Sequence, residues 1–98
     1  HLINGETIFR SLDRNMPVVP ELLNAHPEPS DDPVKSQAAA KTIVEKLYIR
    51  ALTRKPTENE LEIILAGRPD PKDKKARRRF YDGVIWALLN SSEFMLNH

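Results

Sequence analysis

The stretch Phe80-Tyr-Asp-Gly-Val-Ile-Trp-Ala-Leu-Leu89 is apolar around most of the circumference of a helix. One apolar stripe at helical spacing consists of Ala76, Phe80, Val84, Ala87 and Leu88, and beside it lie Tyr81, Ile85, Trp86 and Leu89. A helix with this pattern is typically enclosed by neighbours on several sides, and it is too short to cross a bilayer, which requires about 20 apolar residues. The pattern predicts the central helix of a small bundle. We expect Trp86 at its centre, because a buried indole removes about 150–250 Å² from water.

A second helix is predicted to begin at Asp32-Pro33. The carboxylate of Asp32 is a suitable N-cap acceptor, and proline is favoured at the first helical position. Apolar residues then recur at i, i+3, i+4, i+7, i+8, i+11 and i+12, namely Ala40, Ile43, Val44, Leu47, Tyr48, Ala51 and Leu52. We expect this stripe to pack against the central helix. The predicted core residues are Tyr48, Leu52, Phe80, Trp86 and Leu88.

A short third helix is predicted after Pro56. This proline keeps the residue before it out of the helical region, so the second helix ends just upstream. Thr57 and Glu60 match a capping box, in which each side chain accepts a hydrogen bond from the backbone of the other. Gly67 suits the end of the helix that follows.

The same signals set the bounds of the central helix. Asp70-Pro71 repeats the Asp-Pro pattern, which predicts a helix over residues 71–90. Asn90 and Glu93 form a second capping pattern. We therefore expect a separate short helix at the C-terminus.

The first third of the chain contains two segments of different character. Residues 1–14 predict one amphipathic helix, with apolar side chains at Leu2, Ile3, Ile8, Phe9 and Leu12. Residues 15–33 contain five of the eight prolines, and each proline constrains its own φ and the residue before it. We interpret residues 15–33 as a proline-rich loop, in which the apolar residues at 18, 19, 22 and 23 can dock a short turn.

These elements predict an all-α fold. We expect a small helical bundle of about four main helices plus a short C-terminal helix, with residues 34–98 as the helical core. A chain of 98 residues suits a single domain over residues 1–98. Because it opens on His1-Leu2-Ile3 without an initiator Met, we expect it to be a fragment of a larger protein.

Composition excludes several function classes. The net charge of +1 gives no overall field that would attract nucleic acid or anionic lipid. The absence of cysteine excludes disulfides, thiolate metal sites, a thiol nucleophile and C-x-x-C-H haem attachment within these residues. His1, His26 and His98 lack a metal-binding partner at i+3 or i+4, and the carboxylates suggest no acid–base pair. We expect no catalytic, metal or cofactor site in this segment, and no enzyme activity.

The strongest charge feature is residues 72–79, in which six of eight positions are basic. The candidate basic patch consists of Lys74, Lys75, Arg77, Arg78 and Arg79. A short helix, a turn and a basic helix are typical of a helix-turn-helix. However, the side chains point in several directions and Asp73 interrupts them, so a solvated helix face is favoured.

Arg54 is predicted to have a structural role. It follows the second helix, where a cation can bind the free carbonyl groups. A partly buried guanidinium also requires a carboxylate, and Asp82 or Glu93 are the candidates. We take Arg54 and Asp82 as the candidate buried ion pair.

Three segments together resemble one protein family. They are His1-Leu-Ile-Asn-Gly-Glu-Thr-Ile8, then Leu47-Tyr48-x-x-Ala51-Leu52-x-Arg54-x-Pro56-Thr57-x-x-Glu60-Leu61, then Val84-Ile-Trp86-Ala-Leu-Leu-Asn90-Ser-x-Glu93-Phe94-x-x-Asn97-His98. In this order they resemble the C-terminal end of the large exported proteins of planctomycetes and related bacteria. Those proteins typically carry a cytochrome c-type domain near the N-terminus, followed by two domains of unknown function.

The resemblance implies an exported parent protein, periplasmic or secreted, with any haem elsewhere in it. It implies no catalytic residues. We expect a non-catalytic helical module that packs against the remainder of its parent chain or a partner protein. The expected contact residues are Leu2, Ile3, Phe94 and Leu96. Two alternatives stay open: nucleic-acid binding through residues 72–79, and an accessory part of an enzyme active site that other domains complete.

Overall fold

The computed structural model describes residues 18–96, with side chains as far as residue 91. Four helices make up this part of the chain: α2 (Val18–Ala25), α3 (Pro33–Leu52), α4 (Glu58–Ala66) and α5 (Lys74–Leu96). No strand is present between residues 18 and 96. The predicted all-α bundle is therefore confirmed.

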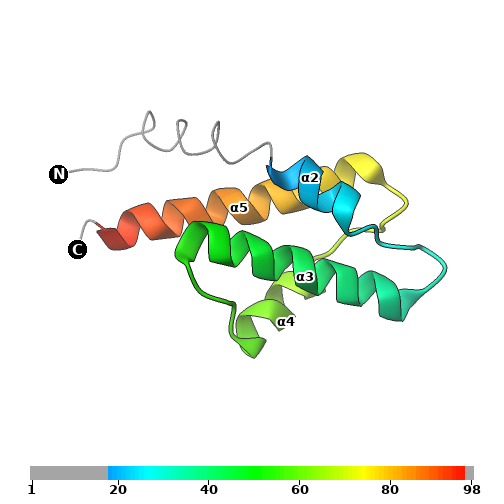
Figure 1. The fold of residues 1–98 in the computed structure, drawn as a ribbon, viewed down its shortest axis with the longest axis horizontal. Coiled ribbons are helices and arrows are strands. Elements are labelled where there is room, and N and C mark those ends of the chain that lie inside the picture. Colours follow the sequence, from blue (N-terminus) through cyan, green and yellow to red (C-terminus); the bar gives the residue numbers. More distant parts are fainter. Residues whose placement is uncertain (1–17, 97–98) are drawn as a thin grey trace.

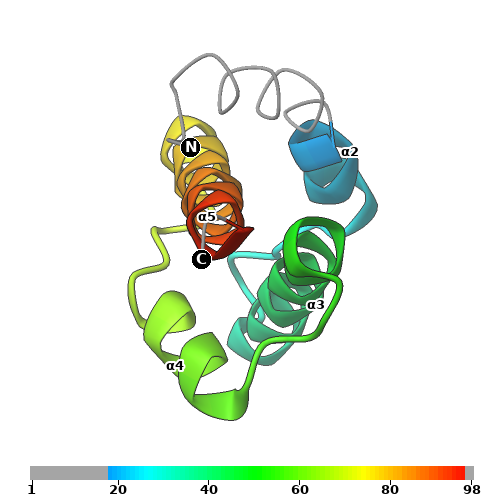
Figure 2. The same cartoon turned by 90° about the vertical axis from the view of Figure 1, so that its left-hand side faces the viewer.

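The two long helices, α3 and α5, pack against each other and form the centre of the bundle (Figure 1). Seen from the end, α2 and α4 lie on opposite sides of this pair (Figure 2). The shorter helix α2 contacts α5, whereas α4 contacts α3. This arrangement gives α5 a buried side toward α3 and two flanks, one beside α2 and one beside α4.

The core lies between α3 and α5, and α2 covers one edge of it. Its buried apolar residues are Val19, Ala40, Ile43, Val44, Leu47, Tyr48, Tyr81, Ile85 and Leu88. The predicted core residues Tyr48 and Leu88 are buried, and Leu52 and Phe80 are partly buried against this cluster.

The prediction for Trp86 is wrong, because its indole is 46% exposed. The buried side of α5 is formed by Tyr81, Ile85 and Leu88, which are spaced i, i+4 and i+7. Successive residues of a helix are about 100° apart, so Trp86 points well away from the direction of Ile85. The helix is packed on fewer sides than its apolar pattern suggests.

The ends of α3 and the start of α4 follow the sequence signals. The Asp32 carboxylate accepts a hydrogen bond from the backbone N–H of Lys35 at 3.1 Å. The helix ends at Thr53, which has a left-handed φ of 57° and donates its N–H to the Ile49 carbonyl. The capping box of Thr57 and Glu60 is present in both directions, with N–H to side-chain oxygen distances of 2.8 and 3.1 Å. These predictions are confirmed.

Helix α5 differs from the prediction at both ends. It begins at Lys74 rather than residue 71, because the Asp73 carboxylate caps it by accepting from the N–H of Ala76 at 3.0 Å. It then continues to Leu96 without a break. A capping residue needs non-helical backbone, whereas Asn90 and Glu93 lie inside the helix. The predicted separate C-terminal helix is therefore wrong.

Residues 15–33 are not a loop throughout. Residues 18–25 form α2, and Pro20 is accommodated in its first turn, where no intrahelical N–H bond is required. Val19 is fully buried, so α2 is part of the bundle. The helix predicted over residues 1–14, with Leu2 and Ile3, lies outside the described residues, as do the side chains of Phe94 and Leu96.

Candidate functional site

A buried carboxylate, that of Glu28, lies at the centre of the main polar cluster. The side chain of Glu28 is fully shielded from water. Its Oε1 accepts a hydrogen bond from Arg68 Nη1 at 3.1 Å. Its Oε2 accepts from Arg77 Nε and from the hydroxyl of Tyr81 at 3.0 Å. We call Glu28, Arg68, Arg77 and Tyr81 the Glu28 cluster.

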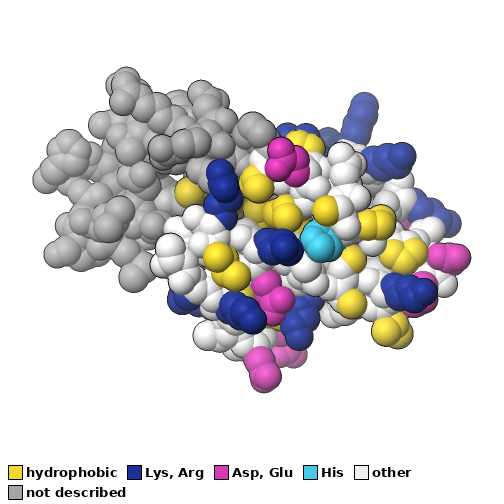
Figure 3. All heavy atoms as spheres, viewed as in Figure 1, with side chains coloured by type: hydrophobic (Ala, Val, Ile, Leu, Met, Phe, Trp, Pro, Cys, Tyr) yellow, Lys and Arg dark blue, Asp and Glu magenta, His cyan; other side chains and the backbone are white. Residues whose placement is uncertain are grey.

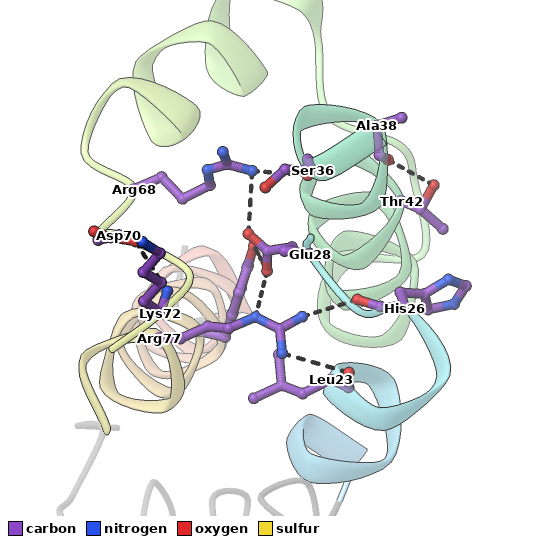
Figure 4. A network of polar contacts seen from close by, with 11 residues as sticks. Leu23, His26, Glu28, Ser36, Ala38, Thr42, Arg68, Asp70, Lys72 and Arg77 are labelled. Atoms are coloured by element: carbon purple, nitrogen blue, oxygen red, sulfur yellow. Dashed lines mark hydrogen bonds and ion pairs between the residues drawn. The ribbon is translucent and has the colours of Figure 1, made fainter. Parts of the chain in front are cut away.

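The two arginines of the Glu28 cluster also bind backbone carbonyl groups (Figure 4). Arg68 Nη1 donates to the carbonyl of Ser36 at 2.8 Å, and Arg77 Nη2 donates to that of His26 at 2.8 Å. The cluster therefore joins four places: the end of α2, the start of α3, the segment before α5, and α5 itself. Burial, and the adjacent charge of Glu28, raise the pKa of Tyr81 above its ordinary value, so its hydroxyl remains a donor.

The Glu28 carboxylate receives its hydrogen bonds from within the cluster. Both carboxylate oxygens accept hydrogen bonds, and the Arg77 side chain is only 14% exposed. A buried ion pair that is fully hydrogen-bonded is costly to break, because removing one partner leaves an uncompensated charge. This arrangement supports a structural role, since neither carboxylate oxygen of Glu28 is exposed to solvent.

A second polar group lies at the turn between α3 and α4. The guanidinium of Arg54 donates to both carboxylate oxygens of Glu60, at 2.9 and 3.1 Å, and lies 5.4 Å from the centre of the Tyr48 ring. The pKa of Glu60 is lowered to about 2, mainly by the hydrogen bond from Arg54 and secondly by the hydrogen bond from the Thr57 backbone N–H. We call Arg54, Glu60, Thr57 and Tyr48 the Arg54 corner.

The predicted ion pair of Arg54 with Asp82 is wrong. Asp82 instead accepts from Arg78 Nε at 3.0 Å, one turn earlier on α5. Arg54 is also not buried, since its side chain is 49% exposed. The capping box explains the difference, because it brings the carboxylate of Glu60 to the turn where Arg54 lies.

The predicted basic patch is not one surface. Arg77 is held in the Glu28 cluster and Arg78 pairs with Asp82, whereas Lys74, Lys75 and Arg79 are exposed. On the face shown in Figure 3, Lys and Arg side chains are spread over the described surface with Asp and Glu side chains among them. Two of the five predicted cations are thus already bound to carboxylates.

An open apolar groove of about 480 Å³ lies between α4 and α5. Helix α4 contributes Ile63 and Ile64, and α5 contributes Phe80, Gly83 and Ala87. Ile63 is 66% exposed although it is a large apolar residue. Gly83 lies in the interior of α5, and, apart from its chain neighbours and the adjacent backbone of its own helix, a Cβ built on it would meet no atom within 4 Å. An exposed apolar groove of this kind is suited to binding another molecule.

Sequence reasoning missed Glu28, Arg68 and the groove. Glu28 lies between two prolines in a segment interpreted as a loop, and no spacing pattern connects it with partners 40 to 53 residues away. The groove has a weak sequence signal in Gly83, because glycine is unfavourable inside a helix. Its walls come from three helices, so only the fold reveals it.

Comparison with known proteins gives no relative: no family model, no curated protein and no solved structure matches this chain. Within residues 18–96, no helix combines the length and apolar character required to cross a bilayer. The described side chains also contain no group of three or more His, Asp or Glu residues that could hold a metal ion.

Proposed function

We propose that this chain is a non-catalytic helical module that binds an apolar helix in the groove between α4 and α5. The proposal rests on the position of Gly83, which lies in the interior of α5 and lines the groove. Glycine in a helix interior costs about 0.5–1 kcal/mol relative to alanine. Outside the adjacent backbone of α5 itself, no described atom lies close enough to Gly83 to exclude an alanine side chain. Close approach of a partner's backbone would exclude it.

The lining of the groove defines the chemistry of the partner. Its walls are mostly apolar, and Ile63 stands exposed on the α4 side. Arg79, one turn before Gly83 on α5, is exposed. An amphipathic helix fits this site, with apolar residues at i, i+3 and i+4 in the groove and an acidic residue near Arg79.

We assign that helix to the remainder of the parent chain. The resemblance of three segments to the C-terminal end of large exported bacterial proteins supports this source. On this proposal the module acts outside the cytoplasm and has no cofactor of its own, and any haem belongs to another domain.

The two alternative functions have weaker support. A nucleic-acid site on residues 72–79 would lack Arg77 and Arg78, because both are paired with carboxylates. Three exposed cations of the predicted patch remain. If these three cations form a nucleic-acid site, changing Lys74, Lys75 and Arg79 to Gln should abolish a salt-dependent binding of duplex DNA. An accessory role in an enzyme would require open polar groups, whereas those of Glu28 are internally bound.

Photo-crosslinking in the full-length protein tests the proposal. Benzoylphenylalanine replaces Ile63 at the edge of the groove, and a control carries it at Val34, which is 79% exposed on α3. We expect position 63 to form a crosslink to one peptide of the parent chain, and position 34 to form none.

A groove-filling variant supplies the specificity control. Gly83→Leu should abolish the crosslink from position 63 while the helical circular dichroism is retained, because the leucine occupies the space of the partner. Equal yields from both positions, or a crosslink that persists with Gly83→Leu, would contradict the proposal. A crosslink to a different protein would overturn the assigned source.

A further inference from the structure

A second hollow lies on the other flank of α5, between α2 and the start of α5. Its volume is about 380 Å³. Small-molecule sites in proteins have volumes of about 300–1,000 Å³, so this space is large enough for a small ligand. We call it the α2–α5 hollow. It is separate from the groove, which lies beside α4.

Three cations of α5 line the α2–α5 hollow. Lys74, Arg77 and Arg78 are spaced i, i+3 and i+4, so they share one side of the helix. Lys74 is exposed, and among the described side chains none forms an ion pair with it. Arg78 donates to Asp82 through Nε, and its side chain is 41% exposed. Two of the three cations can therefore meet a ligand directly.

The charges beside the α2–α5 hollow do not balance. In the Glu28 cluster the guanidinium groups of Arg68 and Arg77 share a single carboxylate (Figure 4). Their side chains are only 15% and 14% exposed, so an excess positive charge is held away from water. The carboxylate of Glu28 is fully shielded and does not face an anion in the hollow. Because a buried charge without a counter-charge is unfavourable, the hollow favours an anionic ligand.

The remaining walls of the α2–α5 hollow are largely apolar. Pro20 and Leu23 belong to α2, Pro27 follows that helix, and Pro71 precedes α5. The ring of each proline fixes its own φ, which makes these walls rigid. A rigid site loses little freedom when a ligand binds. The hollow thus places an apolar wall next to a cationic one.

We propose that the α2–α5 hollow binds a small organic carboxylate with an apolar body. The apolar body lies against the prolines, and the carboxylate accepts hydrogen bonds from Lys74 and from the Nη groups of Arg78. A carboxylate suits this site because its two oxygens match the planar fork of a guanidinium. The proposal concerns a different surface from the groove and does not depend on the proposed function.

The compound 2-naphthoate is a suitable probe, because it joins a flat apolar body to one carboxylate. In an NMR titration of the full chain, it should saturably shift the backbone amides of residues 23–24 and 74–78. For a ligand of this size we expect a dissociation constant of roughly 1 mM. The neutral 2-naphthamide lacks the charge and acetate lacks the apolar body. Each should bind at least about tenfold more weakly.

A pair of double variants tests the position of the site. Lys74→Gln with Arg78→Gln removes two cations that line the hollow. The matched control, Lys75→Gln with Arg79→Gln, removes the same charge from the same part of α5 but outside the hollow. The first variant should weaken the binding of 2-naphthoate by about tenfold, and the control by less than about twofold. Circular dichroism of each variant establishes that the helices described here are retained.

The titrations of the unchanged chain can overturn the proposal without any variant. Equal binding of 2-naphthamide would show that the site does not select an anion. Equal binding of acetate would reduce the interaction to attraction by surface charge. The absence of a saturable shift at residues 23–24 and 74–78 would also overturn the proposal, as would equal weakening in the two double variants.

Discussion

The two ends of α3 carry polar clusters of similar chemistry and different surroundings. At its start, the Glu28 cluster joins one carboxylate to two arginines and a tyrosine in the interior. Beyond its end, the Arg54 corner joins one carboxylate to one arginine at the surface. Both use charge-assisted hydrogen bonds. They differ in exposure to water and in the distance along the chain that they span.

This difference indicates that the Glu28 cluster stabilises the fold, whereas the Arg54 corner stabilises one turn. The partners of Glu28 lie 40, 49 and 53 residues away, on segments that meet only in the folded chain. Arg54 and Glu60 are six residues apart. Exposed ion pairs contribute little because water screens them, whereas a buried charge that loses its partner is strongly destabilising. We therefore expect unequal consequences when each cluster is broken.

The largest effect is expected from Glu28→Gln. The substitution keeps the shape of the side chain but leaves Arg68 and Arg77 without a counter-charge in the interior. The free energy of unfolding, measured by urea denaturation at pH 7, should fall by about 3–5 kcal/mol. The matched control is Glu62→Gln on the exposed face of α4, which should change it by less than about 0.5 kcal/mol. Similar losses in both variants would remove the distinction between buried and exposed carboxylates.

Tyr81→Phe should have the next largest effect. It removes one of the three donors to the Glu28 carboxylate and leaves the ring in the core. A buried hydrogen bond to a charged group contributes about 1.5–3 kcal/mol, so urea denaturation should show a loss of that order. In the background of Glu28→Gln the same change should cost much less. Equal losses in both backgrounds would show that the hydroxyl does not act through Glu28.

Arg54→Ala should lower the thermal midpoint by far less than either change in the Glu28 cluster. The guanidinium is half exposed, so water replaces most of its contacts. Differential scanning calorimetry at pH 7 provides the comparison. A loss as large as that of Glu28→Gln would show that the turn between α3 and α4 is as important to the fold as the interior cluster.

The smallest effect concerns pH. The pKa of Glu60 is lowered to about 2 from its ordinary value of 4.5 by Arg54 and Thr57. Its contribution to stability is therefore present above pH 4.5 and is lost as the pH falls toward 2. Carbon-detected NMR titration should find the pKa of the Glu60 carboxyl group well below its ordinary value of 4.5, and Arg54→Gln should raise this pKa. An unchanged titration in Arg54→Gln would contradict the role of the ion pair.

Local signals in the sequence predicted the starts of α3 and α4 correctly, because a cap involves neighbours in the chain, but the Asp70-Pro71 signal placed the start of α5 too early. Asp32 and the pair Thr57–Glu60 act as their spacing predicts. The capping pattern at Asn90 predicts a helix start, but α5 continues through it without a break. The residues of a capping box can also occur inside a helix, so the pattern alone does not show whether the backbone leaves the helical conformation at Asn90.

The positions that depend on distant partners were not predictable. Glu28 carries no signal of burial, and only the packing of α2 and α5 brings Arg77 and Tyr81 to it. Trp86 illustrates the reverse case. An apolar pattern around α5 indicates that several sides can be covered, but it does not show which neighbours are present to cover them.

Native-state hydrogen exchange tests most directly whether the Glu28 cluster holds α2 in the bundle. In Glu28→Gln, the amides of α2 should lose protection by a larger factor than those of α4, because the end of α2 is released from Arg77. In Glu60→Gln, any loss should be confined to the start of α4. Unchanged protection of α2 in Glu28→Gln, in a chain that remains folded, would contradict the account.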